Sequence, residues 1–174
     1  MSAPAFDLQP ELAGPRLALR PLKPEDLEAL YEAASDPLIW EQHPFHDRWK
    51  RDVFEEFFAE ALRSKGAFAV LDRASGRVAG SSRYYDLDLA KGEVAIGFTF
   101  LRRAYWGGSH NRELKTLMLD HAFRFVPRVI FHVDESNLRS RGAMAKIGGV
   151  LTGKMEKPRP GGPPRSVLVY TISR

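Results

Sequence analysis

Residues 98–125 combine a pair of glycines, the start of a helix and three arginines beside the glycines, Arg102, Arg103 and Arg112, and these residue types together are suited to holding an anion. Gly107 and Gly108 allow a backbone turn to approach a ligand closely. The first amides of the following helix have no partner within it, and the helix dipole favours negative charge there. The sequence therefore predicts a phosphate-binding turn. An ordinary strand-to-helix connection, made tight by glycine, stays open as the alternative because glycine-rich turns are common.

Aromatic and imidazole side chains gather in residues 38–46, a stretch too irregular for a strand and too apolar for a plain surface loop. Such side chains can surround an organic amine, and packing beneath neighbouring helices explains them equally well. The substrate-binding candidates are Trp40, His43 and Phe45, joined by Tyr84, with Tyr85 beside it, from a later segment.

The composition excludes several classes of function. The chain has 174 residues, enough for one well-cored domain, and no cysteine, which excludes disulfides, thiolate metal sites and a cysteine nucleophile. His43 and His46 are separated by a proline and are not expected to bind metal. The net charge of +4 comes from dispersed arginines, so nucleic-acid binding is not expected. With neither a leader-like segment nor a long apolar run, we expect a cytoplasmic location and no membrane contact.

These candidate residues need a scaffold, and the hydrophobic periodicity predicts one. Helices are expected from Pro24 to just before Ser35 and over residues 47–64. A third helix follows the glycine turn, with Leu114, Met118 and Ala122 on its buried face. Strands are expected at residues 16–22, 67–71, 77–85 and 93–101.

Strand 93–101 is expected to border the ligand. Its alternation places Val94, Ile96, Phe98 and Phe100 on one face and Glu93, Ala95 and Thr99 on the other. Gly97 in mid-strand predicts a bulge or a close backbone approach by a ligand.

The last third of the chain predicts a strand at 128–133, a helix from Asn137 to Ile147 and closing strands at 150–155 and 166–172. Asn137 is a good N-cap and Gly148 a plausible residue after the helix end. A flexible stretch at 158–164 joins the closing strands. Residues 1–15 are expected to be a loose lead-in, and residues 16–174 one mixed α/β (α+β) domain.

The order of elements, the turn-and-helix WGGSHNRELK at 106–115, the segment ESNLRS at 135–140 and KIGG at 146–149 together resemble the GCN5-related N-acetyltransferases (GNAT). The ribosomal-protein-alanine acetyltransferase branch (RimJ/RimL-like) is the most similar. The resemblance covers residues 16–172. It implies a central, mostly antiparallel, splayed sheet of about seven strands flanked by about four helices. It also implies acetyl-CoA as donor and direct attack by a primary amine, from a small molecule or a protein N-terminus, in a ternary complex.

The resemblance also implies roles for individual residues. Phe98, Thr99 and Phe100 would border the pantetheine arm, and Asn137 would meet its acetyl end. Ser140 would lie near the sulfur. The remaining cofactor-binding residues would be Arg103, Trp106, Gly107, Gly108, Ser109, His110, Asn111, Arg112 and Arg141.

Three positions depart from the family pattern: Ser109 replaces a glycine or alanine, Ala95 a glutamate that serves as base, and Met144 a tyrosine that serves as acid. Glu93, two residues before Ala95 on the same face, is the catalytic candidate for a water-bridged base, or else a solvated strand-end carboxylate. Ser140 either protonates the leaving thiolate or is an exposed first-turn serine.

Loss of the usual base affects an α-amine, with a pKa near ~7.8, less than a lysine near ~10.4. An acyl-CoA-binding or sensor protein with weak catalysis is the alternative function. The edges of the closing strands can also pair in a homodimer.

Overall fold

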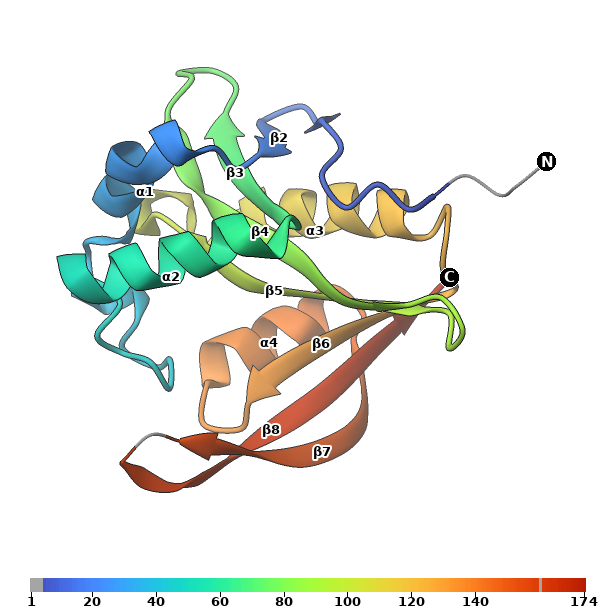
Figure 1. The fold of residues 1–174 in the computed structure, drawn as a ribbon. Coiled ribbons are helices and arrows are strands. Elements are labelled where there is room, and N and C mark those ends of the chain that lie inside the picture. Colours follow the sequence, from blue (N-terminus) through green and yellow to red (C-terminus); the bar gives the residue numbers. More distant parts are fainter. Residues whose placement is uncertain (1–4, 160) are drawn as a thin grey trace.

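The computed structural model describes residues 5–159 and 161–174, which form one eight-stranded sheet covered by helices on both faces (Figure 1). The strands lie in the order β1-β2-β3-β4-β5-β6-β8-β7, and every neighbouring pair is antiparallel except β5 and β6. The predicted mixed α/β architecture with a mostly antiparallel sheet is confirmed. The strands are β1 (Leu12–Ala13), β2 (Leu17–Pro21), β3 (Ala67–Asp72), β4 (Val78–Asp88), β5 (Glu93–Leu101), β6 (Arg128–Asp134), β7 (Val150–Arg159) and β8 (Gly162–Ser173).

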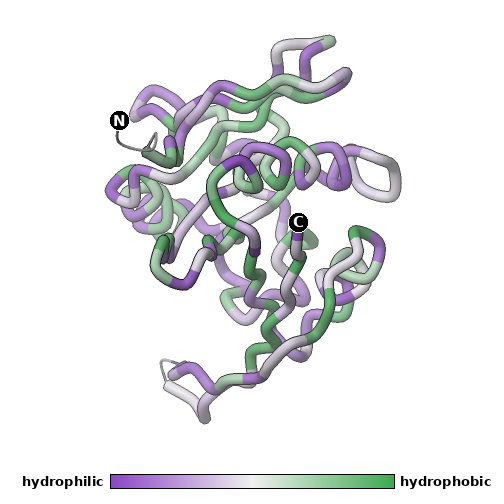
Figure 2. Tube along the Cα trace, turned by 90° about the vertical axis from the view of Figure 1, so that its right-hand side faces the viewer, coloured by the Kyte–Doolittle hydropathy of each residue, from purple (hydrophilic) through white to green (hydrophobic). Residues whose placement is uncertain are grey.

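The helices α1 (Leu27–Ala34) and α2 (Arg51–Ser64) cover one face of the sheet, and α3 (His110–Ala122) and α4 (Leu138–Lys146) cover the other (Figure 1). The side chains of β3 show the division, because alternate strand residues point to opposite faces. Phe68 and Val70 join the core beneath α3, whereas Ala67 and Ala69 join the core beneath α1 and α2. In Figure 2, hydrophilic and hydrophobic residues alternate along the helical coils, as expected for helices with one buried face.

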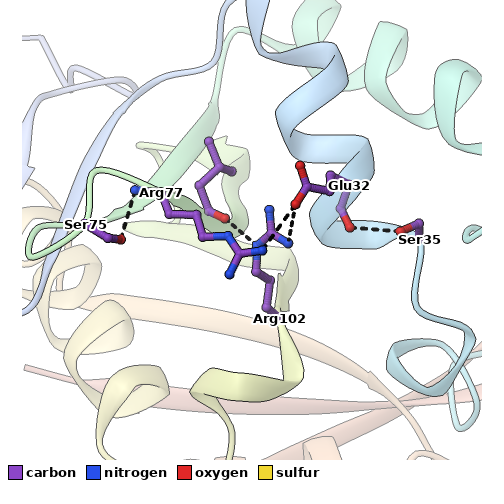
Figure 3. A network of polar contacts seen from close by, with 6 residues as sticks. Glu32, Ser35, Ser75, Arg77 and Arg102 are labelled. Atoms are coloured by element: carbon purple, nitrogen blue, oxygen red, sulfur yellow. Dashed lines mark hydrogen bonds and ion pairs between the residues drawn. The ribbon is translucent and has the colours of Figure 1, made fainter.

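Polar contacts hold α1 against the sheet (Figure 3). Arg77, ahead of β4, and Arg102, just after β5, converge on the carboxylate of Glu32 with nitrogen–oxygen distances of 3.2 and 3.4 Å. Arg102 also donates from Nε to the carbonyl of Val78 at 2.7 Å. The hydroxyl of Ser35 donates to the Glu32 carbonyl at the end of the helix. This network orients α1 over the ends of β4 and β5.

β5 and β6 are paired for only three residues. Glu93–Ala95 match Arg128–Ile130, and the strands then diverge (Figure 1). Beyond this point β5 continues to Leu101 and β6 to Asp134. The parallel pair therefore opens into a fork between β5 and β6.

The predicted bulge at Gly97 is confirmed, and it overturns the predicted faces of β5. The register of β5 on β4 shifts by one residue between the pairs Arg83–Gly97 and Ser81–Phe100. Phe98 takes the left-handed conformation, with a φ of 54°. Because one extra residue reverses the alternation, Ile96 packs towards α3 whereas Phe100 packs beneath α1 and α2.

Other boundaries also differ from expectation. α2 begins at Arg51, four residues after the predicted start, because residues 47–50 form a turn. Residues 5–15 are not a loose lead-in: Phe6 is buried against α3, and β1 extends the sheet. Residues 1–4 lie outside the described part of the chain. In the predicted flexible stretch, β7 continues to Arg159 and β8 begins at Gly162, and residue 160 is again outside the description.

Candidate active site

A cavity of about 760 Å³ occupies the fork between β5 and β6. Residues of both strands line it, together with the glycine turn, the first turns of α3 and α4, β8 and the segment before α2. Its geometry is easiest to follow from the glycine turn, through the fork, to the segment before α2.

The glycine turn supplies an open backbone surface at one end of the cavity. Gly107 has a φ of +77°, which side chains rarely adopt, and a Cβ atom added there would meet nothing within 4 Å. At Gly108 the nearest atom to such a Cβ is Nδ1 of His110, 3.8 Å away. Ser109 directly precedes α3, but its side chain does not cap the helix, and its hydroxyl accepts from Arg16 instead. The first amides of α3 are thus not capped by Ser109 and can face an anion.

Most of the predicted cofactor-binding residues line this cavity, and three do not. Arg103 is paired with Asp36, His110 packs edge-on against Tyr105, and Arg141 donates to the carbonyl of Glu135 at 3.1 Å. Those that do line it are Phe98, Thr99, Phe100, Trp106, Gly107, Gly108, Ser109, Asn111, Arg112 and Asn137.

Lys115 lies in the middle of the cavity wall and was not anticipated from the sequence. Its side chain is 5% exposed, and burial lowers the pKa of its ammonium to about 7. Nζ donates to Oγ1 of Thr99 at 2.6 Å, and that oxygen lies 2.8 Å from the hydroxyl of Ser82. The ammonium also lies 6.0 Å from the centre of the Phe131 ring. The place of Lys115 among the apolar positions of α3 was the one feature of the sequence that could have indicated a buried lysine.

The start of α4 brings Asn137 and Ser140 to the cavity. Oδ1 of Asn137 accepts from the backbone N–H of Ser140 at 3.2 Å, which confirms the predicted N-cap. Gly148, with a φ of +86°, follows the end of the helix as predicted. Met144 is buried at the same wall. A thioether, which cannot donate a proton, stands where the resemblance implies a tyrosine.

The segment before α2 closes the other end of the cavity. Nδ1 of His43 accepts from the backbone N–H of Phe45 at 3.0 Å. Burial, reinforced by Arg48, lowers the pKa of His43 to about 3, so the imidazole is neutral at physiological pH. Trp40 is buried and donates from its ring to the carbonyl of Ala34 at 2.9 Å. All three predicted residues, Trp40, His43 and Phe45, line this end.

Tyr85 and His132 form a hydrogen-bonded pair across the fork, with 2.8 Å between the hydroxyl and Nδ1. Both line the cavity, and the Tyr85 ring packs edge-on against Phe98. Burial raises the pKa of Tyr85 and lowers the pKa of His132. The pair is therefore neutral near pH 7, and its histidine is able to accept a proton.

Two predicted residues lie elsewhere. Tyr84 precedes Tyr85 on β4 and consequently points to the opposite face, where its hydroxyl donates to the carbonyl of Met118. Glu93 lies where β5 and β6 are still paired, 3.9 Å from Arg128 and away from the cavity. Tyr85 replaces Tyr84 as a cavity residue, and no position in the fork is left for Glu93 to act as a base.

Within the described residues, no cluster of three or more histidine, aspartate or glutamate side chains is arranged to hold a metal ion. None of the helices described combines the length and apolar character that crossing a membrane requires.

Comparison with known proteins gives one family. Residues 16–150 match the model of the acetyltransferase (GNAT) domain. A GCN5-related N-acetyltransferase from Brucella melitensis superposes with a TM-score of 0.85 at 22% identity, covering 95% of this chain and 79% of that one. The acetyltransferase (GNAT family) from Bacillus anthracis gives 0.77 at 21% identity, covering 94% and 98%. Spermidine N-acetyltransferase from Vibrio cholerae, solved with CoA and spermine, gives 0.70 at 18% identity, covering 92% and 96%.

Proposed function

Because the chain belongs to the acetyltransferase (GNAT) family and is an acyltransferase, we propose that it transfers the acetyl group of acetyl-CoA to a primary amine by direct attack in a ternary complex. The observation that carries the proposal is the cavity in the fork between β5 and β6. It is continuous from the open glycine turn to the aromatic segment before α2. A donor and an acceptor that enter from opposite ends would meet at the bulge of β5.

The residues at the turn fit the donor. The exposed Gly107 and Gly108, the first amides of α3 and the nearby Arg112 would hold its pyrophosphate. The unpaired length of β5 would hold its pantetheine arm, and Asn137 would lie near the acetyl end. When bound, acetyl-CoA supplies an activated acetyl group in its thioester.

The chain's own groups would then promote attack by the amine. The register of β5 skips Phe98 and Thr99, so their amides are candidates to stabilise negative charge on the carbonyl oxygen. The neutral His132, hydrogen-bonded to Tyr85, would accept the proton that the amine loses. Ser140 would pass its hydroxyl proton to the departing sulfur and take one back from solvent, in place of the tyrosine that Met144 replaces.

An α-amine needs less help from a base than a lysine does, which agrees with the missing family glutamate at Ala95. We therefore propose a small molecule's amine or a protein N-terminal α-amine as the acceptor, and we keep the ribosomal-protein-alanine acetyltransferase branch as the proposed place within the family. We keep the cytoplasm as the proposed location. The exposed edge strand β7 is where a second copy could pair.

Thermal unfolding with and without acetyl-CoA tests the donor site. A ligand at 100 times its Kd adds about 2.7 kcal/mol, which raises the Tm by several degrees for a domain of this size. Gly108→Glu should abolish the rise, because the added carboxylate meets open space and repels the phosphates. Ala74→Glu adds the same charge on the exposed β3–β4 turn and should leave the rise intact.

Release of free thiol in the presence of amines then distinguishes an acetyltransferase from an acyl-CoA-binding protein. Turnover supports the transferase. A rise in Tm without turnover on any amine would favour the acyl-CoA-binding protein, and no rise at all would mean that the glycine turn is structural.

A further inference from the structure

Three arginines surround two aromatic rings at the end of the cavity away from the glycine turn. The guanidinium of Arg48 lies 4.4 Å from the centre of the Phe57 ring and 5.0 Å from that of Phe45. Arg83 approaches the same Phe57 ring at 5.7 Å, and Arg165 the same Phe45 ring at 5.4 Å. Arg83 also lies 3.8 Å from the centre of the Phe98 ring at the bulge. The three side chains come from the segment before α2, from β4 and from β8, so only the tertiary fold brings them together.

Few acceptors are available to these arginines. Arg83 is 4% exposed, and its buried Nε and Nη2 atoms have no hydrogen-bond partner in the described chain. Nε of Arg165 is also buried without a hydrogen-bond partner in the described chain, although its Nη1 lies 3.5 Å from Asp134. Arg48 makes no ion pair among the described residues, and its nearest polar contact is Nε2 of His43 at 3.4 Å. Buried cationic donors without acceptors are costly, so the charge of these arginines would be stabilised by an anion bound at this end of the cavity.

The charges at this end are unbalanced. Arg48, Arg165 and Lys157 line the cavity, and Arg83 lies directly beneath Phe98, whereas Asp134 is the one carboxylate among the described lining residues. Asp47 and Glu60 attract Arg48 from farther away but form no ion pair with it in the described chain. Burial and the nearby Arg83 lower the pKa of Arg48 to about 10, so it remains cationic at pH 7. Like charges held this close favour a bound anion.

We propose that the acceptor is an anionic amine, whose carboxylate or phosphate binds Arg48 and Arg165 while its amine points back to the bulge of β5. The charge of Arg83, behind the Phe98 ring, adds to the attraction. This inference rests on the proposed acetyl transfer and adds the class of acceptor. Arginine is suited to the role because its planar guanidinium matches both carboxylate and phosphate oxygens. The aromatic rings hold the guanidiniums in place without neutralising them. A polycationic acceptor such as spermine would be repelled from this end.

Matched acceptors test the proposal. Alanyl-glutamate amide and alanyl-glutamine amide carry the same α-amine and differ by one carboxylate, and O-phosphoethanolamine paired with ethanolamine makes the same comparison for phosphate. The kcat/KM of each is measured by thiol release. We expect the anionic member of at least one pair to be preferred by about tenfold to a hundredfold, the range for hydrogen bonds to a charged group. The preferred pair identifies the anion.

Variants locate the preference. Arg48→Gln and Arg165→Gln should each reduce it to below about threefold, because kcat/KM falls further for the anionic member than for the neutral one. Arg77→Gln removes the same charge outside the cavity and should leave it intact. Equal or better turnover of both neutral members, or a preference that survives both cavity variants, would overturn the proposal.

Binding keeps this test separate from the test of acetyl transfer. The same four amines are titrated into the CoA-loaded protein, and the rise in Tm with CoA serves as the folding control for each variant. If no amine is acetylated, tighter binding of an anionic member that is lost in Arg48→Gln still supports the anion site. Indistinguishable binding within both pairs rejects it.

Discussion

The ammonium of Lys115 on α3 donates a 2.6 Å hydrogen bond to the hydroxyl of Thr99 on β5, across the wall of the cavity. In the described chain this lysine has no carboxylate partner. Thr99 would keep its contact with Ser82 without the lysine. A buried ammonium without a carboxylate partner lowers the stability of the folded protein. Substitution of Lys115 therefore measures how much stability the protein loses by keeping a lysine at this position.

Lys115→Met should stabilise the free protein by roughly 2–4 kcal/mol at pH 7. The folded pKa of about 7 is below the unfolded value, so the unfolded chain holds the proton more tightly and the wild type gains stability as the pH rises from 7 towards 10. The advantage of the variant should therefore shrink by about 1 kcal/mol between pH 7 and 8 and by about 1.3 kcal/mol between pH 8 and 9. Urea unfolding at pH 7, 8 and 9 measures this, with the exposed Lys91→Met as control. A variant less stable than wild type at pH 7 would contradict the argument.

Tyr85→Phe should lower kcat/KM by about tenfold, because the neutral His132 loses the hydrogen bond that orients it. Burial holds the pKa of His132 below 6.5. With Nε2 free to accept a proton, Nδ1–H donates to the Tyr85 oxygen, a bond that favours the imidazolium. Its loss should lower the pKa of His132 further, and the acid limb of the pH–rate profile should move to lower pH. Tyr84→Phe removes a hydroxyl on the opposite face and should change stability while leaving the profile in place. Identical profiles for wild type and Tyr85→Phe would exclude His132 as the proton acceptor.

His43 should make the protein sensitive to acid. Its folded pKa of about 3 is far below the unfolded value near 6.5. As the pH falls below 6.5, His43 becomes protonated in the unfolded chain but stays neutral in the folded protein. The free energy of unfolding therefore decreases, by about 2 kcal/mol at pH 5. In His43→Asn the amide oxygen can still accept from the Phe45 N–H, and the loss between pH 7 and pH 5 should be correspondingly smaller. His46→Asn, at an exposed neighbour, should behave as wild type. The prediction fails if the two variants lose stability alike.

Ser140 and Asn137 should separate catalysis from folding. Ser140→Ala should lower kcat at least about tenfold while the free energy of unfolding changes by less than about 0.5 kcal/mol. Asn137→Ala removes the cap on the Ser140 N–H and should cost about 1 kcal/mol of stability. Steady-state kinetics and urea unfolding on both variants measure the two effects. Unchanged kcat in Ser140→Ala would mean that water protonates the thiolate.

Residues close together in the sequence were sufficient to predict much of the fold. The bounds of β5 were predicted to the residue, and the Asn137 cap and Gly148 were recognised because capping depends on residues adjacent in sequence. The turn at Gly107 and Gly108 was likewise found from the sequence, because a left-handed turn before a helix needs glycine there.

The sequence by itself predicted a glycine turn suited to an anion, but not how side chains from distant segments meet around the cavity. The bulge at Gly97 was predicted, but its reversal of the faces of β5 became evident only in the register with β4. The alternation of apolar residues in the sequence does not show that an inserted residue moves the rest of the strand to the opposite face. For the same reason the sequence did not show that Tyr85, rather than Tyr84, faces the cavity, or that Glu93 lies outside the fork. Lys115 and the cluster of Arg48, Arg83 and Arg165 were not identified from the sequence for a related reason. A charged residue is read as solvent-facing until packing of distant segments buries it, and only the tertiary structure decides that.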